Sequence, residues 1–440
     1  MVGSNRWPIR RLQDCAVWYS GGTPNKATPH YWGGTIPWIS AKSITGFFIS
    51  DSEDRVTEDG ARNGTRLVPA NTILFIVRGM SLKSEFRMGI TTRPVTFNQD
   101  LKALVPVDGV NPDFLAYAIK ARTEEILGLV GEAGHGTGVL PTDRIQSIEI
   151  PIPSLPEQRA IAHILGALDD KIELNRKTNE TLEAMARALF ESWFVNFDPV
   201  RAKAAGRAPA GMDEATAKLF PSEFEKSELG DVPKGWRYSP ALGLFELVSG
   251  GTPKTEVAEY WGGSIFWASA KDVSQGSSSL FLMESERTIT EHGLASSAAK
   301  LIPAGSVVVV ARGATCGRHV VLGAEMAINQ TCYALVAHEQ TDRWYVAFIA
   351  ETLLARLVQQ AHGSVFDTIT RRTFETALTV HPTSAVRGAF TREVAPWIEL
   401  VHLKQRQSRT LAALRDTLLP KLLSGELAIR DAETFVGRAV

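Results

Sequence analysis

The sequence predicts an α+β protein built from two copies of one mixed α/β domain, each followed by a long helix. Residues 20–42 are matched by residues 249–271, from Ser-Gly-Gly-Thr-Pro to Trp-x-Ser-Ala-Lys, at an offset of 250 − 21 = 229 and without a gap. Each copy carries short apolar runs bounded by Gly-rich turns, and each is followed by apolar residues at helical spacing. A repeat of this length indicates a duplicated domain and not a solenoid of short units.

The bulk composition is that of a globular protein. The 440 residues are 44% apolar and 22% charged, which is enough to bury substantial cores. Because the net charge is −1, any nucleic-acid-binding surface must be local. Three cysteines without a Cys-x-x-Cys pair argue against a disulfide framework or a zinc site. The lack of a signal-peptide pattern and of any long apolar run predicts a cytoplasmic protein that does not span a membrane.

The first domain is predicted over residues 1–153. Apolar runs at 72–77, 103–107 and 148–152 predict strands. Apolar residues at helical spacing predict one helix over 114–129. We therefore expect a mixed α/β domain with an irregular sheet.

A long helix is predicted over residues 154–197. Ser154 and Glu157 are spaced as a capping box, with a Pro in the first turn between them. Seam positions then alternate by four and three, which predicts a coiled-coil seam over about four heptads. The seam comprises Ile161, Leu165, Leu168, Ile172, Asn175, Asn179, Leu182, Ala186, Leu189 and Trp193. Its two central positions are Asn, and polar seam residues fix register and orientation at a cost in stability.

The rest of the chain repeats this order. Residues 198–234 have the composition of a linker, residues 235–383 predict the second domain, and residues 384–440 predict a second long helix and a C-terminal tail. The second seam is also polar in its middle, at Lys404 or Gln405 and at Ser408. Long helices with apolar stripes need a partner in water. The two helices, of about 38 residues and about 57 Å each, are therefore predicted to pair as an antiparallel coiled coil.

Several motifs resemble those of a known family. Residues 155–159, Leu-Pro-Glu-Gln-Arg, are similar to the start of the first conserved helix in the specificity (S) subunits of type I restriction-modification systems. Residues 418–427, Leu-Leu-Pro-Lys-Leu-Leu-Ser-Gly-Glu-Leu, resemble the C-terminal signature of the same subunits. Together with the two globular repeats that start near Ser-Gly-Gly-Thr-Pro, the resemblance covers nearly the whole chain.

This resemblance implies two target-recognition domains, each reading one half of a split site in double-stranded DNA. The helix pair would space the domains and dock adenine methyltransferase subunits, and the restriction and translocation subunit would join through that assembly. S-adenosylmethionine, ATP and magnesium would be bound by those partner subunits and not by this chain. The target sequence does not carry over, because base specificity varies widely within the family.

The chain lacks the motifs of catalytic subunits. It contains no Walker A motif, no Gly-rich dinucleotide fingerprint after a strand and no amino-methyltransferase motif. Residues 100–102 and 169–171 match only the last part of a nuclease motif, and the second triplet lies on the predicted coiled coil. The sequence therefore predicts a non-catalytic DNA binder whose partners perform the chemistry.

Two arginines at matching positions are candidate DNA-reading residues. Arg78 and Arg312 each follow a β-branched run and precede a Gly. Arginine offers a bidentate fork to guanine or phosphate, and glycine lets the backbone approach closely. The alternative is an ion pair with a carboxylate inside the domain, and the sequence leaves both interpretations open.

Four further cations are candidate phosphate contacts. Lys83 and Arg318 lie in the loops that follow the two arginines. Lys42 and Lys271 follow the Trp-x-Ser-Ala strands at matching positions. For these two lysines the alternative is a solvated surface side chain.

Two Gly-rich loops are also candidate DNA contacts. The first contains His135 and Thr137, and the second contains His362 and Ser364. The loop amides and the hydroxyl groups are suited to phosphate. Neither histidine is accompanied by further metal ligands, so no metal site is predicted.

Some residues are shared by both copies and are predicted to have structural roles. The Asn-Gln pairs at 98–99 and 329–330 have the chemistry to contact adenine. However, both copies keep the pair although the two domains are expected to read different half-sites, which favours a role in satisfying backbone groups. The same argument favours core packing over nucleotide stacking for the Tyr-Trp pairs at 31–32 and 260–261.

Three other classes of protein compete with this interpretation. A carbohydrate-binding protein would use the paired Tyr and Trp residues but would not explain two matched coiled-coil helices. An orphan or anti-restriction protein of the same fold would bind DNA without partner enzymes. A fused restriction-methylation enzyme would need catalytic motifs that the chain lacks.

Overall fold

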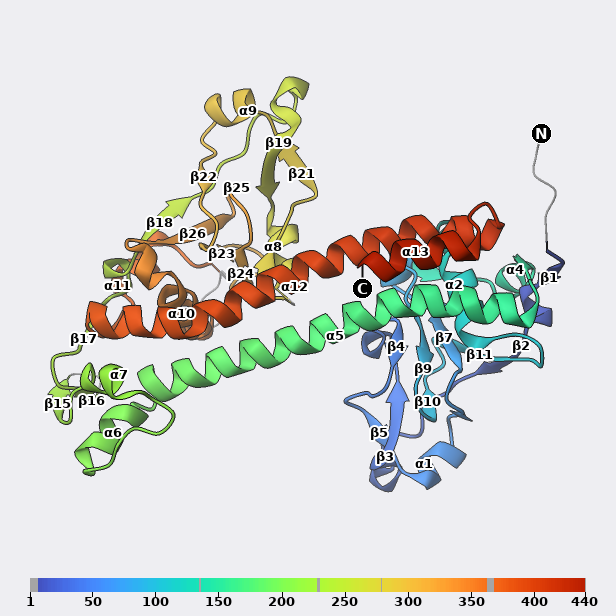
Figure 1. Ribbon diagram of the computed structural model, residues 1–440, viewed down its shortest axis with the longest axis horizontal. Coiled ribbons are helices and arrows are strands. Elements are labelled where there is room, and N and C mark those ends of the chain that lie inside the picture. Colours follow the sequence, from blue (N-terminus) through green and yellow to red (C-terminus); the bar gives the residue numbers. More distant parts are fainter. Residues whose placement is uncertain (1–6, 134–135, 228–229, 278, 362–367, 440) are drawn as a thin grey trace. The chain divides into compact units, whose positions relative to one another are not determined.

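A computed structural model describes residues 7–133, 136–227, 230–277, 279–361 and 368–439. The chain divides into two compact units. Unit 1 contains residues 1–174 and 408–440, and unit 2 contains residues 175–407. Each unit combines one globular domain with a part of each long helix (Figure 1).

Two sheets form the main part of the globular domain in unit 1. The larger has the strand order β2-β11-β7-β9-β4, in which only β4 and β9 pair in parallel. Its strands are β2 (Ala16–Ser20), β11 (Leu101–Pro106), β7 (Ile73–Ile76), β9 (Met88–Thr91) and β4 (Phe48–Ile49). The smaller sheet has the order β5-β3-β10-β6, with β5 (Arg55–Val56), β3 (Trp32–Ile39), β10 (Val95–Phe97) and β6 (Leu67–Val68). All four residues of strand β7 are apolar, and all four are buried in the core.

Two small sheets complete this domain. Strands β1 (Ile9–Arg11) and β14 (Glu149–Pro151) pair and bring the two ends of the domain together. Strands β12 (Gly131–Ala133), β13 (Thr137–Val139) and β8 (Arg78–Gly79) form a three-stranded sheet. The predicted strands at 72–77, 103–107 and 148–152 are thus confirmed to within two residues as β7, β11 and β14.

The helices of this domain differ from the prediction at one point. In place of one helix over 114–129, the structure has α2 (Pro112–Lys120) and α3 (Thr123–Gly128). Arg122 leaves the helical conformation at φ −100° and ψ 16°, and the Thr123 hydroxyl donates to the Lys120 carbonyl. This local side-chain bond competes with the helix ladder, which the apolar spacing does not reveal. The remaining helices are α1 (Glu58–Arg62) and α4 (Thr142–Gln146).

The globular domain of unit 2 repeats this topology, which confirms the duplication. The larger sheet has the order β18-β26-β23-β24-β20, with β18 (Phe245–Ser249), β26 (Cys332–Ala337), β23 (Val307–Val310), β24 (His319–Leu322) and β20 (Phe281–Leu282). The smaller has the order β21-β19-β25-β22, with β21 (Arg287–Ile289), β19 (Trp261–Ala268), β25 (Met326–Ile328) and β22 (Leu301–Ile302). Strands β17 (Arg237–Pro240) and β27 (Leu378–His381) correspond to β1 and β14. The helices are α8 (Ala270–Gly276), α9 (Glu291–Ala295), α10 (Arg343–Ala361) and α11 (Arg371–Thr376).

The segment predicted as a linker is more ordered than its composition suggests. It contains α6 (Asp198–Ala204), α7 (Glu214–Lys218) and a hairpin of β15 (Phe224–Ser227) and β16 (Gly230–Pro233). Phe220 and Val232 are buried in the core of unit 2, where Phe220 packs on Trp193 at 5.0 Å. The segment therefore folds onto unit 2, because a few large apolar residues anchor an otherwise polar stretch.

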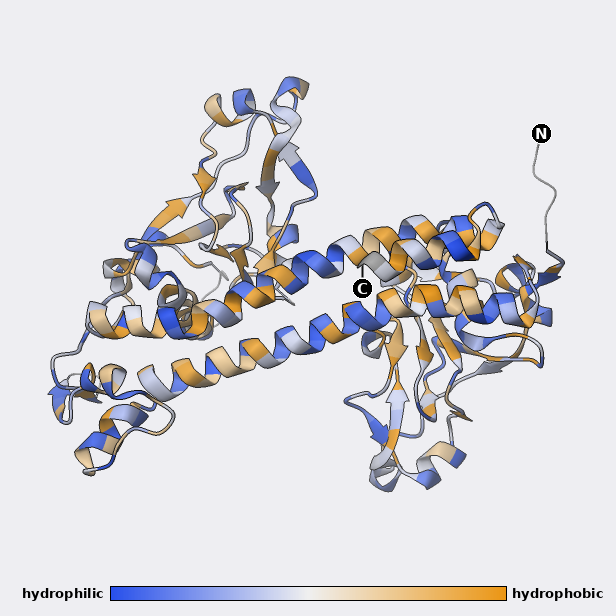
Figure 2. Cartoon of the chain, viewed as in Figure 1, coloured by the Kyte–Doolittle hydropathy of each residue, from blue (hydrophilic) through white to orange (hydrophobic). Residues whose placement is uncertain are grey.

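Helices α5 (Leu155–Phe194) and α12 (Ser384–Ser424) are the two predicted long helices, and a short amphipathic helix α13 (Ile429–Ala439) follows. Figure 2 shows apolar stretches along both long helices, with more polar residues in the middle of each. Within unit 2 the pairing is antiparallel, because Asn175 contacts Lys404 and Gln407 while Phe190 contacts Phe390. In unit 1 the seam residues Ile161, Leu165, Leu168, Leu411, Leu418 and Leu422 are buried in one core. In the described parts of the chain, no helix is long and apolar enough to cross a membrane.

Candidate nucleic-acid interface

The repeated Ser-Gly-Gly-Thr-Pro segment is held in the same way in both domains. The Thr23 hydroxyl donates to Gln99 Oε1 at 2.6 Å, and Thr252 makes the same bond to Gln330. A Cβ at Gly21 would lie 2.3 Å from the Asn98 carbonyl oxygen, so only glycine fits there. The loop is thereby clamped onto the turn before β11 in unit 1 and before β26 in unit 2.

The shared Asn-Gln pairs have the structural role that was predicted. Asn98 is 7% exposed, and its Oδ1 accepts the backbone N–H of Asp100 at 3.2 Å. Asn329 Oδ1 likewise accepts the backbone N–H of Thr331 at 3.2 Å. These amide oxygens close the turns and are not available to adenine edges.

The shared tryptophans pack on each other inside each smaller sheet. Trp32 and Trp38 meet edge to face with ring centroids 5.3 Å apart, and Trp261 and Trp267 repeat this at 5.2 Å. The indole N–H of Trp38 donates to the Gly22 carbonyl at 3.0 Å, and that of Trp267 makes the equivalent bond. Trp32 and Trp261 are half-buried against the buried Trp38 and Trp267, which agrees with a packing role for these tryptophans.

Arg78 and Arg312 occupy the same place in the two domains. Arg78 pairs with Val139 in the three-stranded sheet, and Arg312 forms an isolated antiparallel bridge with Thr368. Both side chains are exposed, and among the described residues neither has an ion pair or a side-chain hydrogen bond. Within those residues, the alternative of an internal ion pair is therefore not what the structure has, and both guanidinium groups are available for a ligand.

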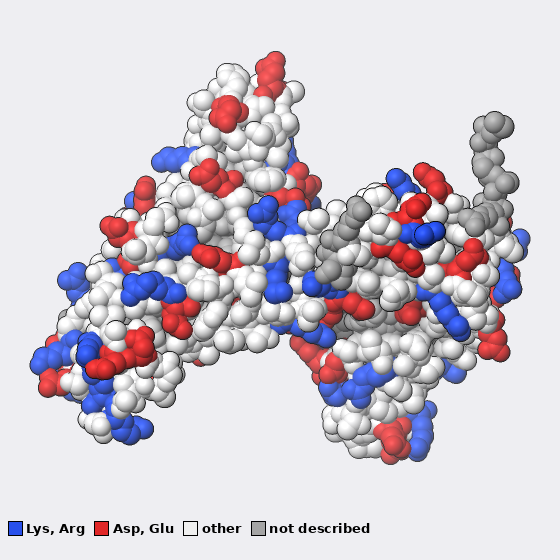
Figure 3. Space-filling view, in the orientation of Figure 1, with Lys and Arg blue, Asp and Glu red and all other residues white. Residues whose placement is uncertain are grey.

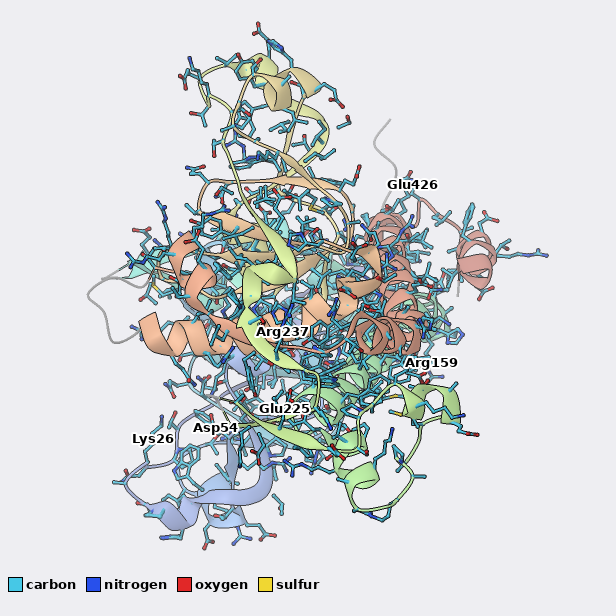
Figure 4. The ribbon with its side chains drawn as sticks, turned by 90° about the vertical axis from the view of Figure 1, so that its left-hand side faces the viewer. Lys26, Asp54, Arg159, Glu225, Arg237 and Glu426 are labelled. Carbon is cyan, nitrogen blue, oxygen red and sulfur yellow. The ribbon has the colours of Figure 1, made fainter. Side chains whose placement is uncertain are left out.

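The candidate lysines, in contrast, have carboxylate neighbours. Lys42 lies 3.4 Å from Asp54 and 3.6 Å from Glu53, and the hydrogen bond that Lys42 donates to Asp54 raises the pKa of this lysine. Asp54 lies in the first domain just before β5 (Figure 4). Lys271 pairs with Glu286 at 2.5 Å, which raises the pKa of that lysine. Exposed pairs of this kind are weak, so phosphate can displace the carboxylates, but only in competition with them.

The two loop cations differ between the domains. Lys83 pairs with Glu132, whose carboxyl pKa is lowered by that hydrogen bond. Arg318 is exposed and has no ionic partner among the described residues. Of the four Gly-rich loop residues, Thr137 is half-buried in β13, opposite Ala133. His135, His362 and Ser364 lie outside the described residues.

Charge is spread and not concentrated on the visible face. Figure 3 shows Lys and Arg side chains interspersed with Asp and Glu side chains over this face.

The part of the chain that the structure describes contains no group of three or more His, Cys, Asp or Glu residues placed to hold a metal ion. Burial raises the thiol pKa of Cys15 to about 11 and that of Cys332 to about 12, as expected of core residues.

Sequence reasoning missed a buried ionic cluster in unit 1. Asp169 on α5 accepts a hydrogen bond of 2.8 Å from the Tyr117 hydroxyl on α2 and pairs with Arg415 on α12. In the sequence, Asp169 stands out only as part of a nuclease-like triplet. Asp169 lies three residues before the seam residue Ile172 and is therefore next to the predicted seam. A carboxylate at such a position is the one feature of the sequence that could have indicated this cluster.

Comparisons with known proteins agree with this architecture. The family model for the type I restriction modification DNA specificity domain matches residues 5–184 and 233–378. The MjaIX specificity subunit of Methanocaldococcus jannaschii is 26% identical over 434 residues, which cover 97% of this chain and 94% of that protein. The HindI specificity subunit of Haemophilus influenzae is 27% identical over 361 residues, covering 72% of this chain and 78% of that protein.

A solved structure shares the fold. The crystal structure of the type I restriction-modification S subunit from M. genitalium superposes with a TM-score of 0.56 at 14% identity. It covers 96% of this chain and 97% of its own. Because the family model matches both domains and most of the chain, the protein belongs to the family of type I restriction-modification DNA specificity subunits.

Proposed function

We propose that this chain reads a bipartite DNA site, with one half-site for each globular domain, as the specificity subunit of a type I restriction-modification complex. The observation that carries the proposal is the pair Arg78 and Arg312. The two arginines lie at equivalent positions of the duplicated domains, are exposed, and have no ionic partner among the described residues. A guanidinium group binds guanine bidentately in the major groove. Two guanidinium groups at equivalent positions of two duplicated domains suit a DNA site with two halves.

The partners follow from the family. Adenine methyltransferase subunits and a restriction and translocation subunit would assemble on this chain in the cytoplasm. S-adenosylmethionine, ATP and magnesium would be bound by those subunits. The proposal that this chain is itself non-catalytic is supported by the lack of Walker A, dinucleotide and amino-methyltransferase motifs in the sequence. The isolated chain is accordingly expected neither to bind S-adenosylmethionine nor to cut DNA.

The candidate DNA-contacting residues are ranked by whether they already pair with a carboxylate. Arg78 and Arg312 are proposed as base contacts, and Arg318 as a phosphate contact. Lys42, Lys83 and Lys271 are proposed as weaker phosphate contacts, because each must leave a carboxylate. The loop residues His135, Thr137, His362 and Ser364 remain proposed phosphate contacts.

The proposal is tested by selection from duplexes with randomised half-sites, using the chain reassembled with its methyltransferase subunits. The Arg312→Ala variant should lose about 1–3 kcal/mol of binding free energy and relax one position of one half-site. Arg78→Ala should act in the same way on the other half-site. Lys271→Ala is the matched control from the same domain and should weaken all sequences alike and by less.

Three outcomes separate the alternatives. Uniform weakening by Arg312→Ala would assign this residue to phosphate. Unchanged binding by both arginine variants would contradict the proposed interface. A wild-type protein that binds all duplexes equally would contradict the proposed function itself.

A further inference from the structure

The first observation is the ionic cluster that joins three helices in unit 1. The Asp169 side chain is 5% exposed and the Arg415 side chain 13% exposed, and the two form an ion pair between α5 and α12. From α2, the Tyr117 hydroxyl donates to Asp169 and the Lys120 ammonium lies 3.9 Å from the same carboxylate. Removing Arg415 would leave the buried carboxylate with the Tyr117 hydroxyl and the more distant Lys120 ammonium, which compensates its charge less well and is unfavourable.

The second observation is that the positions equivalent to Asp169, Arg415 and Tyr117 are apolar in unit 2. The repeat offset of 229 residues relates Asp169 to Ile398 and Arg415 to Ala186. Ile398 and Ala186 are both fully buried in the core of unit 2. Tyr117 is the sixth residue of α2, and the sixth residue of α10 is Phe348, which lacks the hydroxyl.

The third observation concerns the polar middle of the helices. Lys404 is the repeat equivalent of Asn175, and the two are in contact: Lys404 Nζ donates to Asn175 Oδ1 at 3.3 Å. Asn175 Nδ2 also donates to Gln407 Oε1 at 3.0 Å. Equivalent positions of the two copies therefore face each other, as in an antiparallel dimer, but their side chains differ in charge.

These positions decide which helices can pair. In an antiparallel α5–α5 pair, the register would place Asp169 against Ala186 of the second copy. Its carboxylate would then lose Arg415 and keep only the Tyr117 hydroxyl and the Lys120 ammonium at 3.9 Å. In an α12–α12 pair, Arg415 would face Ile398, and the two Lys404 ammonium groups would face each other. The first arrangement removes the nearest cation from a buried carboxylate, and the second opposes two like charges. Only the α5–α12 pair keeps all of these contacts.

We propose that the Asp169–Arg415 ion pair and the Asn175–Lys404 contact select α5–α12 pairing and reject self-pairing of either half of the chain. The surface of each half thus fits the other half, and not a second copy of itself. Without these charged groups, the duplication would give the two halves similar helix surfaces, and each half could pair with a second copy of itself. The proposal concerns helix pairing alone and does not depend on which DNA the domains bind.

The test uses the full folded chain with a protease site placed in residues 206–211, which lie between α6 and α7. After cleavage, the two halves are allowed to exchange in mild denaturant, and their assembly is measured by native mass spectrometry. For the wild-type sequence we expect the heterodimer of the two halves in more than about tenfold excess over both homodimers. A statistical mixture of homodimers and heterodimers from the wild type would overturn the proposal.

A variant that equalises the seams provides the matched comparison. It combines Tyr117→Phe, Asp169→Ile, Arg415→Ala and Lys404→Asn. The first three changes give unit 1 the residue types of the equivalent positions in unit 2, and the fourth makes the central residues identical. We expect this variant to form both homodimers as well as the heterodimer. Persistence of the heterodimer alone would overturn the proposal, because other contacts would then specify the pairing. Arg159→Ala is the control, since Arg159 is exposed near the start of α5 (Figure 4), and it should behave as the wild type.

A second pair of variants tests the proposal if the variant with four substitutions does not fold. The exchange of Asp169→Arg with Arg415→Asp keeps opposite charges between α5 and α12 and should preserve the heterodimer. The single change Asp169→Arg opposes two cations in that pair and should reduce the heterodimer excess at least tenfold. Equal behaviour of these two variants would overturn the proposal.

Discussion

His381 in β27 is surrounded by groups that disfavour its charged form. Its ring lies so close to Gly243 that a Cβ there would be 2.9 Å from the ring carbon Cε1. Burial, and then the charges of Arg387 and Arg237, lower the pKa of this histidine to about 4. The Thr379 hydroxyl lies within hydrogen-bonding distance of Nε2, at 3.2 Å, and is suited to the neutral ring.

This histidine predicts a loss of stability in mild acid. The unfolded chain binds a proton at His381 near pH 6.5, whereas the folded chain binds it only near pH 4. Between these values the unfolded state holds more protons, so the free energy of unfolding falls as the pH falls, by at most about 1.4 kcal/mol per pH unit. Urea unfolding at pH 7 and pH 5 should show a smaller loss for His381→Gln than for the wild type. Parallel losses would show that His381 does not contribute.

Whether a cation is available to DNA depends on its neighbours in space. Arg78 and Lys42 look alike in the sequence, since each follows a strand in the first domain. Lys42 lies beside Asp54 and Glu53, whereas Arg78 has no acidic partner among the described residues. The structure therefore ranks two cations that the sequence could not rank.

At the scale of elements, the long helices are held by a seam that changes character along its length. It is apolar in unit 1 around Leu165 and Leu418, polar at Asn175 and Lys404, and aromatic at Phe190 and Phe390. Asn179 Oδ1 is buried and has no hydrogen-bond partner within the described parts of the chain, which weakens the middle of α5 further. Polar seam residues are expected to specify the register, and the apolar parts to supply most of the stability.

Helix length is predicted to set the distance between the half-sites. One heptad inserted after Thr178 in α5, together with one before Lys404 in α12, keeps the seam in register and lengthens the pair by about 10 Å. At about 3.4 Å per base pair, this should add about three base pairs to the unspecified spacer with both half-sites unchanged. Sequencing of the sites methylated by the reassembled enzyme measures the spacer.

The control for this prediction is the same heptad inserted into α5 alone. That insertion shifts seam residues out of register, so it should lower the thermal stability instead of lengthening the spacer. An active double-insertion variant with the original spacer would rule out the helices as the ruler.

At the scale of the whole molecule, the duplication makes each domain a separable reader. Replacing residues 1–153 by the first domain of another specificity subunit should change one half-site and leave the other unchanged. The graft must keep Tyr117 and Lys120, because both contact Asp169 on α5. A graft without them leaves the buried carboxylate with fewer partners and should fold less stably. Methylation-site sequencing checks the first outcome, and a change in both half-sites would show that the domains are not independent.

Much of this architecture follows from the sequence by itself. The repeat of Gly, Trp and Asn-Gln motifs determined two domains of one topology, and the alternating seam determined two long helices with a polar middle. These features depend on spacing along the chain, which a single sequence shows directly. The structural roles of the shared residues also followed, because both copies kept them.

Only the tertiary structure decided which charged groups meet. It paired Lys42, Lys83 and Lys271 with carboxylates, and it folded residues 198–234 onto unit 2. It also joined Asp169 to Arg415, which lie on two different helices far apart in the sequence. An ion pair depends on distance in space and on burial, and neither leaves a periodic trace in the sequence. The sequence therefore predicted the frame of each domain, whereas the cations left available to DNA and the contacts that fix the helix pairing required the folded chain.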